Sequence, residues 1–101
     1  MPIQERKMPE TDSYQYMAEI FKALAHPTRL LILDKLKEGE RCVCELQEFV
    51  GGDMSTVSRH LGVLRNAGLI ASEKRQNWIY YRLLCPCVFD MYECVAALGR
   101  H

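Results

Sequence analysis

The sequence of 101 residues lacks any long apolar run. A membrane span needs about 18 or more consecutive apolar residues, so no membrane partner is expected. The first residues are polar and charged and lack an apolar h-region, which argues against a secretory signal and predicts a cytoplasmic location. The sequence also has no phosphate-binding glycine loop and no carboxylate pair in a pocket-forming context. We therefore do not expect an enzyme.

The sequence has no net charge, with 13 basic and 13 acidic residues, so its composition gives no sign of a nucleic-acid partner. The charges are nevertheless unevenly distributed. Between residues 54 and 82, five lysines and arginines stand against a single acid, Glu73, whereas the segments on either side are acidic. A basic segment in an otherwise acidic domain predicts a surface that faces phosphates.

Cysteine is the unusual component of this composition. Five cysteines is an odd number, which excludes a fully paired disulfide framework within one chain. In a reducing compartment, clustered cysteines indicate metal or redox chemistry, whereas an isolated buried cysteine is small apolar packing. The clusters here are Cys42 with Cys44, and Cys85 with Cys87.

The sequence contains no internal repeat and no sign of a second domain. We expect a flexible arm over residues 1–12 and one domain over residues 13–101. Apolar residues at helical spacing predict helices over about residues 13–25, 28–36, 42–50, 55–67 and 88–98, with His26 at the first helix junction. From residue 69 to 83 the apolar period is two, which predicts a two-stranded hairpin. Its turn is Gln76-Asn77, where asparagine tolerates a positive φ. The fold class is α+β and mainly helical.

Two short helices, a glycine turn and a helix with a polar outer face follow the order of a helix-turn-helix motif. The helix that hides Val57, Leu61 and Leu64 is expected to expose hydroxyls and basic groups, which bind base edges and phosphates. A basic hairpin tip beside it suits a wing along the adjacent DNA backbone. The candidate DNA contacts are Ser55, Thr56, Ser58, Arg59, His60 and Arg65 on the helix, and Lys74, Arg75, Gln76 and Asn77 on the hairpin. For the helix alone, an ordinary solvated polar face is the alternative.

Several segments together resemble the ArsR/SmtB family of metal-sensing repressors. They are residues 21–33 (FKALAHPTRLLIL), 42–46 (CVCEL), 55–61 (STVSRHL) and 78–83 (WIYYRL), within a resemblance that covers about residues 17–84. The resemblance implies a winged helix-turn-helix homodimer with a two-stranded wing, dimerising through its first and last helices. It also implies a repressor that binds double-stranded operator DNA without a cofactor and leaves it when a toxic metal or metalloid binds.

Cys42 and Cys44 match the arsenic-site motif of this family and are the first candidate metal ligands. Thiolates select soft ions, which favours arsenic(III) or antimony(III) as inducer, with another soft metal ion as the alternative. Residues i and i+2 do not face each other on a regular helix. One ion bound by both is therefore expected to distort the first turn and so displace the next helix. The family's third cysteine is replaced here by Gln47.

Cys85 and Cys87 are the other candidate metal ligands, and their role stays open at this point. Three alternatives remain. Cys85, Cys87 or Cys94, from either protomer, supplies a third ligand to the first pair. Otherwise these three cysteines form a separate site, or Cys94 only packs in the dimer interface. The histidine and carboxylate spacing of the family's zinc sensors is not reproduced on the last helix. A redox or persulfide sensor of the same fold, and a constitutive DNA-binding protein with structural cysteines, are the competing functions.

Overall fold

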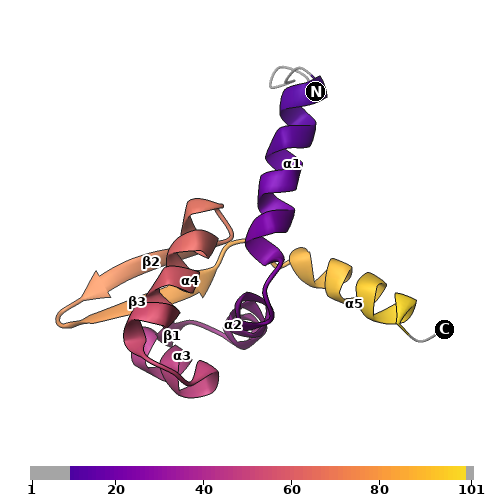
Figure 1. Ribbon diagram of the computed structural model, residues 1–101. Helices are drawn as coiled ribbons and strands as arrows, with labels where there is room; N and C mark the ends of the chain where they lie inside the picture. The colour runs from indigo at the N-terminus through magenta and orange to yellow at the C-terminus, as the bar shows by residue number, and fades with distance from the viewer. Residues whose placement is uncertain (1–9, 100–101) are drawn as a thin grey trace.

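The computed structural model describes residues 10–99 (Figure 1). The elements are α1 (Glu10–Leu24), α2 (Pro27–Lys37), β1 (Arg41–Cys42), α3 (Val43–Val50), α4 (Met54–Asn66), β2 (Ile70–Arg75), β3 (Trp78–Leu83) and α5 (Val88–Leu98). The mainly helical α+β class is confirmed. Helix α1 begins three residues earlier than expected, and the remainder of the predicted arm lies outside the described residues.

The sheet has three antiparallel strands in the order β1-β3-β2, which are the two strands of the predicted wing and one further strand that was not predicted. The added strand, β1, is only two residues long and pairs Arg41 with Tyr81 and Cys42 with Tyr80. A strand this short has no periodicity of its own, because it is defined by its pairing with the free edge of β3. Cys42 therefore lies in the sheet and not inside the third helix.

The wing is the hairpin of β2 and β3, which reaches away from the helices in Figure 1. Its register runs from Ile70 opposite Leu83 to Arg75 opposite Trp78. The two-residue turn was predicted correctly, but the positive φ of 58° is at Gln76 and not at the asparagine. A positive φ at the first loop residue is a feature of the tight turns that match strand twist.

The core lies where α2, α3 and α4 meet the sheet. Val57, Leu61 and Leu64 of α4 are completely buried, as their spacing predicted. The other side chains buried to the same extent are Ile32, Leu33, Leu46 and Ile70. Helix α4 is thus fixed by its apolar side, and its opposite side is left for function.

Helices α1 and α5 project from this body in different directions (Figure 1). They expose large apolar side chains, among them Phe21 on α1 and Met91, Val95 and Leu98 on α5. Between the two helices lies an apolar groove of about 410 Å³. The Tyr92 hydroxyl donates to the Leu30 carbonyl oxygen over 2.7 Å and holds α5 against α2. No helix between residues 10 and 99 combines the length and apolarity of a membrane span.

Candidate DNA-binding surface and cysteine pairs

The start of α4 is organised by Asp53, its N-cap residue. The Asp53 carboxylate accepts the Thr56 backbone N–H at 2.9 Å and the Ser55 hydroxyl at 3.1 Å. These bonds, led by that of the Thr56 N–H, lower the pKa of Asp53. The carboxylate therefore stays ionised and holds the first turn, so Ser55 and Thr56 lie at a fixed helix start.

The outer face of α4 and the hairpin tip present most of the predicted contacts to solvent. Ser55, Ser58, Arg59 and Arg65 are exposed on α4, and Thr56 is half-exposed. At the hairpin tip Lys74, Arg75, Gln76 and Asn77 are exposed. The helix face is therefore polar and basic as predicted, with one exception.

The exception is His60, which is buried rather than exposed. Its Nδ1 accepts a hydrogen bond from Arg29 Nε at 3.2 Å, and its ring lies 4.4 Å from that of His26. Burial, followed by the charges of His26 and Arg29, lowers the pKa of His60. The prediction of an exposed His60 was wrong because it treated the helix as isolated, in which case a polar residue faces solvent. Its bonding partners, distant in sequence, draw it inward.

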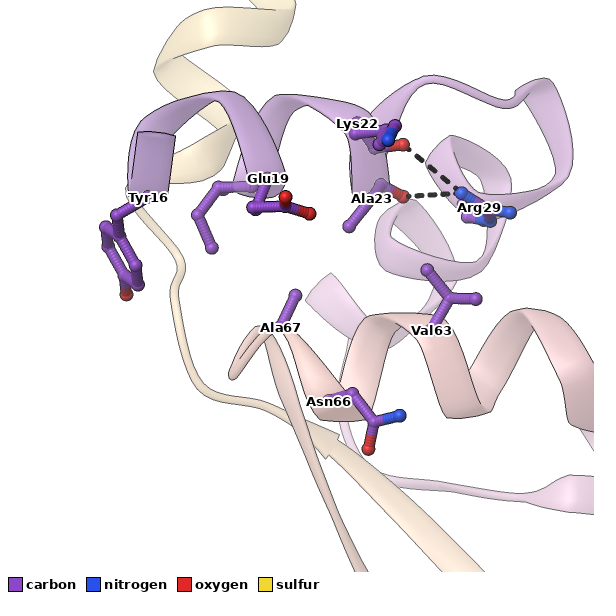
Figure 2. Close-up of a pocket in the computed structure, with 9 residues that line it drawn as sticks. Tyr16, Glu19, Lys22, Ala23, Arg29, Val63, Asn66 and Ala67 are labelled. Atoms are coloured by element: carbon purple, nitrogen blue, oxygen red, sulfur yellow. Dashed lines mark hydrogen bonds between the residues drawn. The ribbon is translucent and has the colours of Figure 1, made fainter. Parts of the chain in front are cut away.

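Arg29 joins three helices beside a cleft between α1 and α4 (Figure 2). Its Nη1 donates to the carbonyl oxygens of Lys22 and Ala23, both at 3.3 Å, at the end of α1. Its Nε reaches His60 on α4, and Arg29 itself lies on α2. His26 adds to the junction, since its Nδ1 accepts the Thr28 N–H and caps α2. The expected junction role of His26 is thus observed, and these contacts fix α4 relative to α1 and α2.

Cys42 and Cys44 lie side by side, with their Sγ atoms 2.8 Å apart. Cys42 is the N-cap of α3, with extended backbone at φ −71° and ψ 151°. Its sulfur accepts the Cys44 N–H at 3.4 Å, and Glu45 accepts the Cys42 N–H at 2.9 Å. The prediction that the helix begins at Cys42 was wrong, because Cys42 precedes the helix as its N-cap and turns its thiol back onto it, so the two sulfurs meet beside a regular first turn.

The pair of Cys42 and Cys44 offers two thiols as ligands. The hydrogen bond from Cys42, with a smaller contribution from burial, raises the pKa of Cys44. Among the described residues, no cluster of three or more cysteine, histidine or acidic side chains is placed to hold a metal ion. The structure therefore does not bring Cys85, Cys87 or Cys94 of the same chain to this pair.

Cys85 and Cys87 form their own pair between β3 and α5, with Sγ atoms 3.2 Å apart. Cys85 is half-buried, and Cys87 and Cys94 are exposed. The strand register separates this pair from the first one, since Cys42 lies opposite Tyr80 and β3 continues to Leu83 before the link begins. The molecule thus presents two separate dithiols.

Arg75 connects the wing to the segment that carries Cys42, a contact that the sequence analysis missed. Its guanidinium donates to both carboxylate oxygens of Glu40, at 2.9 and 2.6 Å, and to Glu73 at 2.9 Å. It also lies 4.7 Å from the ring centre of Tyr80, the strand partner of Cys42. These acids hold the pKa of Arg75 above its usual range. Glu40 is 35 residues from Arg75, so no local pattern could have shown the pair.

Comparisons with known proteins agree with this geometry. The family model described as "Bacterial regulatory protein, arsR family" matches residues 26–72. An uncharacterised HTH-type transcriptional regulator of Methanocaldococcus jannaschii is 36% identical over 86% of this chain and 99% of that protein. The arsenical resistance operon repressor of Escherichia coli is 42% identical over 70% of this chain and 62% of its own. The solution structure of a homodimeric winged helix-turn-helix DNA-binding domain from Mycobacterium bovis superposes with a TM-score of 0.80. It is 31% identical, over 91% of this chain and 90% of that one.

Proposed function

Because the chain belongs to the ArsR family of bacterial regulatory proteins, we propose that this transcriptional repressor leaves its operator when a soft ion binds Cys42 and Cys44. One observation carries the proposal. The two sulfurs, 2.8 Å apart, lie on a segment that both caps α3 and forms a strand of the wing sheet. A ligand on this pair would therefore contact α3, which precedes α4, and the sheet whose wing strands follow α4.

The proposed DNA contacts are on α4 and the wing. Arg59 is placed to reach a guanine edge or a phosphate, and Ser58 lies beside it on the exposed face. Arg65, Lys74, Gln76 and Asn77 extend the surface toward the adjacent backbone, with Ser55 and Thr56 at the helix start. Arg75 joins this surface only by exchanging Glu40 for a phosphate, and His60 is removed from it because it is buried.

The proposed partner in the active form is a second copy of the chain. Helices α1 and α5 carry the exposed apolar side chains, and an apolar groove runs between them. A second copy covers these surfaces, and the two-fold relation gives two recognition helices for two operator half-sites. The homodimeric Mycobacterium bovis domain supports this arrangement.

The proposed inducer is arsenic(III) or antimony(III). Soft thiolates select such ions, and arsenical resistance repressors are among the relatives of this chain. Binding replaces the contact between Cys42 and Cys44, which alters the α3 cap and the two-residue strand β1. The displacement reaches the wing through Tyr80 and the Glu40–Arg75 pair. A 100-fold release requires roughly 2.7 kcal/mol of coupling, which is within the ordinary allosteric range.

The test is operator binding with and without arsenite. We expect wild-type protein to lose about 100-fold in affinity, in line with that coupling, and the Cys42→Ser, Cys44→Ser variant to bind DNA and ignore arsenite. The Arg59→Ala variant should bind the operator about 10-fold or more weakly while keeping its response, since a base contact contributes about 1–3 kcal/mol. A double cysteine variant that still responds at wild-type arsenite concentrations would place the sensor elsewhere. Peroxide in place of arsenite separates a redox sensor from a metalloid sensor.

A further inference from the structure

The link between β3 and α5 holds the second cysteine pair in a rigid turn. The N–H groups of residues 88–90 donate to the carbonyl oxygens three residues earlier, at 3.1 to 3.2 Å. Pro86, between the two cysteines, also has its φ fixed by its ring. The backbone at Cys85 and Cys87 is therefore ordered before any ligand arrives, and in this arrangement the two sulfurs lie 3.2 Å apart.

The thiols of this pair are available because they do not support the fold in the way that Cys42 does. The Cys42 thiol caps α3, whereas Cys87 precedes α5 without making any side-chain cap bond. Cys87 is exposed and Cys85 is half-buried. A small solute therefore reaches both sulfurs without opening the core or breaking a helix cap.

The spacing of the two sulfurs selects the kind of ligand. With bonds of about 2.3 Å, sulfurs at this distance subtend an angle of about 90° at the bound atom. A linear two-coordinate ion needs the sulfurs roughly 4.6 Å apart with the same bond length, so it does not fit. The angle suits the pyramid of trivalent arsenic or antimony. Within residues 10–99 no cluster of three ligating side chains exists, so the third position is left to a group from solution.

We infer that Cys85 and Cys87 form a second, independent binding site for trivalent arsenic or antimony, held by two thiolates. The third valence is occupied by hydroxide or by an organic substituent. In the reaction two arsenic–oxygen bonds break and two arsenic–sulfur bonds form. The two thiol protons leave with the hydroxides as two water molecules, and no atom is oxidised or reduced. This site goes beyond the proposed function, since it does not depend on whether Cys42 and Cys44 are the sensor.

Phenylarsine oxide, which hydrates to a compound with two exchangeable hydroxides, is the matching probe. Its stoichiometry is counted by intact-protein mass spectrometry on the reduced full chain. We expect two equivalents for the wild type, and one each for the Cys42→Ser, Cys44→Ser variant and the Cys85→Ser, Cys87→Ser variant. The variant that lacks all four cysteines should bind none. Cys94→Ser is the matched control and should still bind two.

The single variant Cys87→Ser keeps the test decisive if a double variant does not fold, because this side chain is exposed. Its circular dichroism spectrum should be that of the wild type, and its stoichiometry should be one. A folded Cys87→Ser that still binds two equivalents overturns the inference, as does a Cys42→Ser, Cys44→Ser variant that binds none. Arsenite-induced DNA release is measured separately in the same variants. If Cys42 and Cys44 bind nothing, the wild type binds one equivalent and Cys87→Ser binds none, which counts against the proposed sensor and leaves this inference standing.

Discussion

The two cysteine pairs have the same spacing in the sequence but different surroundings. Cys42 ends a strand, caps a helix and is buried, and its strand partner Tyr80 lies under the guanidinium of Arg75. Cys87 lies in a turn, is exposed and caps nothing through its side chain. The comparison teaches that a Cys-x-Cys motif acquires its role from the element at which its first cysteine lies.

The difference in surroundings also determines how strongly ligand binding at each pair can affect DNA binding. A ligand changes a distant equilibrium only to the extent that it prefers one state of the protein. At the first pair, a bound ligand would disturb a cap and a strand that lead to the wing, so we expect binding and DNA release to be coupled. At the second pair the turn is already formed, so we expect ligand binding to change the structure little and to have little effect on DNA affinity.

The first prediction tests whether the two cysteine pairs share the same acid–base chemistry. Contact with the neighbouring thiol raises the pKa of Cys44 and of Cys85, so one thiol of each pair holds its proton near pH 7. A cadmium ion must displace at least this proton, and its apparent affinity should rise about 10-fold or more per pH unit below the pKa of that thiol. Arsenous acid loses its hydroxides as water, so its affinity should stay within about 2-fold over the same range.

Apparent dissociation constants between about pH 6 and about pH 8 check this, measured on the two double-serine variants so that each pair is seen alone. A flat cadmium profile for one pair would show that its thiolates are already formed, and the two pairs would then differ in chemistry as well as in surroundings.

The second prediction concerns transmission to DNA. Cys44→Ser should abolish the roughly 100-fold release by arsenite, because one ligand of the coupled pair is lost. Cys87→Ser should leave the release within about 2-fold of the wild type, since its exposed side chain caps no helix and lies beyond the end of β3. Fluorescence anisotropy with a labelled operator measures both. Equal losses in the two variants would contradict the separation of the pairs.

The third prediction concerns stability. Cys42→Ala removes a buried side chain and an N-cap and should lower the free energy of unfolding by about 1–2 kcal/mol. Cys42→Ser keeps an acceptor at the cap and should lie between this variant and the wild type. Cys87→Ala should stay within about 0.5 kcal/mol of the wild type. Urea unfolding followed by circular dichroism gives all three values, and a Cys87→Ala as unstable as Cys42→Ala would remove the structural difference between the pairs.

The smallest expected effect tests the link from the first pair to the wing. Glu40→Gln removes the bidentate partner of Arg75, which becomes available to a phosphate. Operator affinity without inducer should rise about 3-fold at low salt, and the salt dependence should steepen by about one unit. The response to arsenite should weaken.

Glu38→Gln is the matched control for this link. It removes the same charge from the same segment, but Glu38 pairs with Arg41 and not with the wing. If both glutamines have the same effect, the change is one of net charge, and the Glu40–Arg75 pair carries no coupling.

Periodicity was sufficient to predict the body of this fold. Val57, Leu61 and Leu64 recur on one side of α4 and are completely buried, and the period of two correctly indicated the hairpin. What periodicity could not show is pairing over long separations. The strand at Cys42 exists because β3 has a free edge, and this placed the cysteine outside the helix to which it had been assigned.

The same reason explains what was missed at two site residues: His60 is buried, and Arg75, exposed as predicted, is paired with an acid distant in sequence. His60 and Arg75 are polar and occupy positions that an isolated helix or hairpin would expose. The first is drawn inward by Arg29, 31 residues away, and the second is engaged by Glu40, 35 residues away. Contacts of this kind follow from the assembled tertiary structure, and neighbouring residues in the sequence carry no trace of them.

The projection of α1 and α5 from the body has a consequence for gene dosage. Since the apolar sides of these helices are covered only when two copies meet, the active form obeys mass action, and its melting temperature should rise with protein concentration. At concentrations below the dimer dissociation constant, operator occupancy follows the square of the chain concentration. Halving the chain concentration in a cell then reduces operator occupancy about fourfold, so dilution by cell growth without new synthesis acts on the same promoter as the inducer.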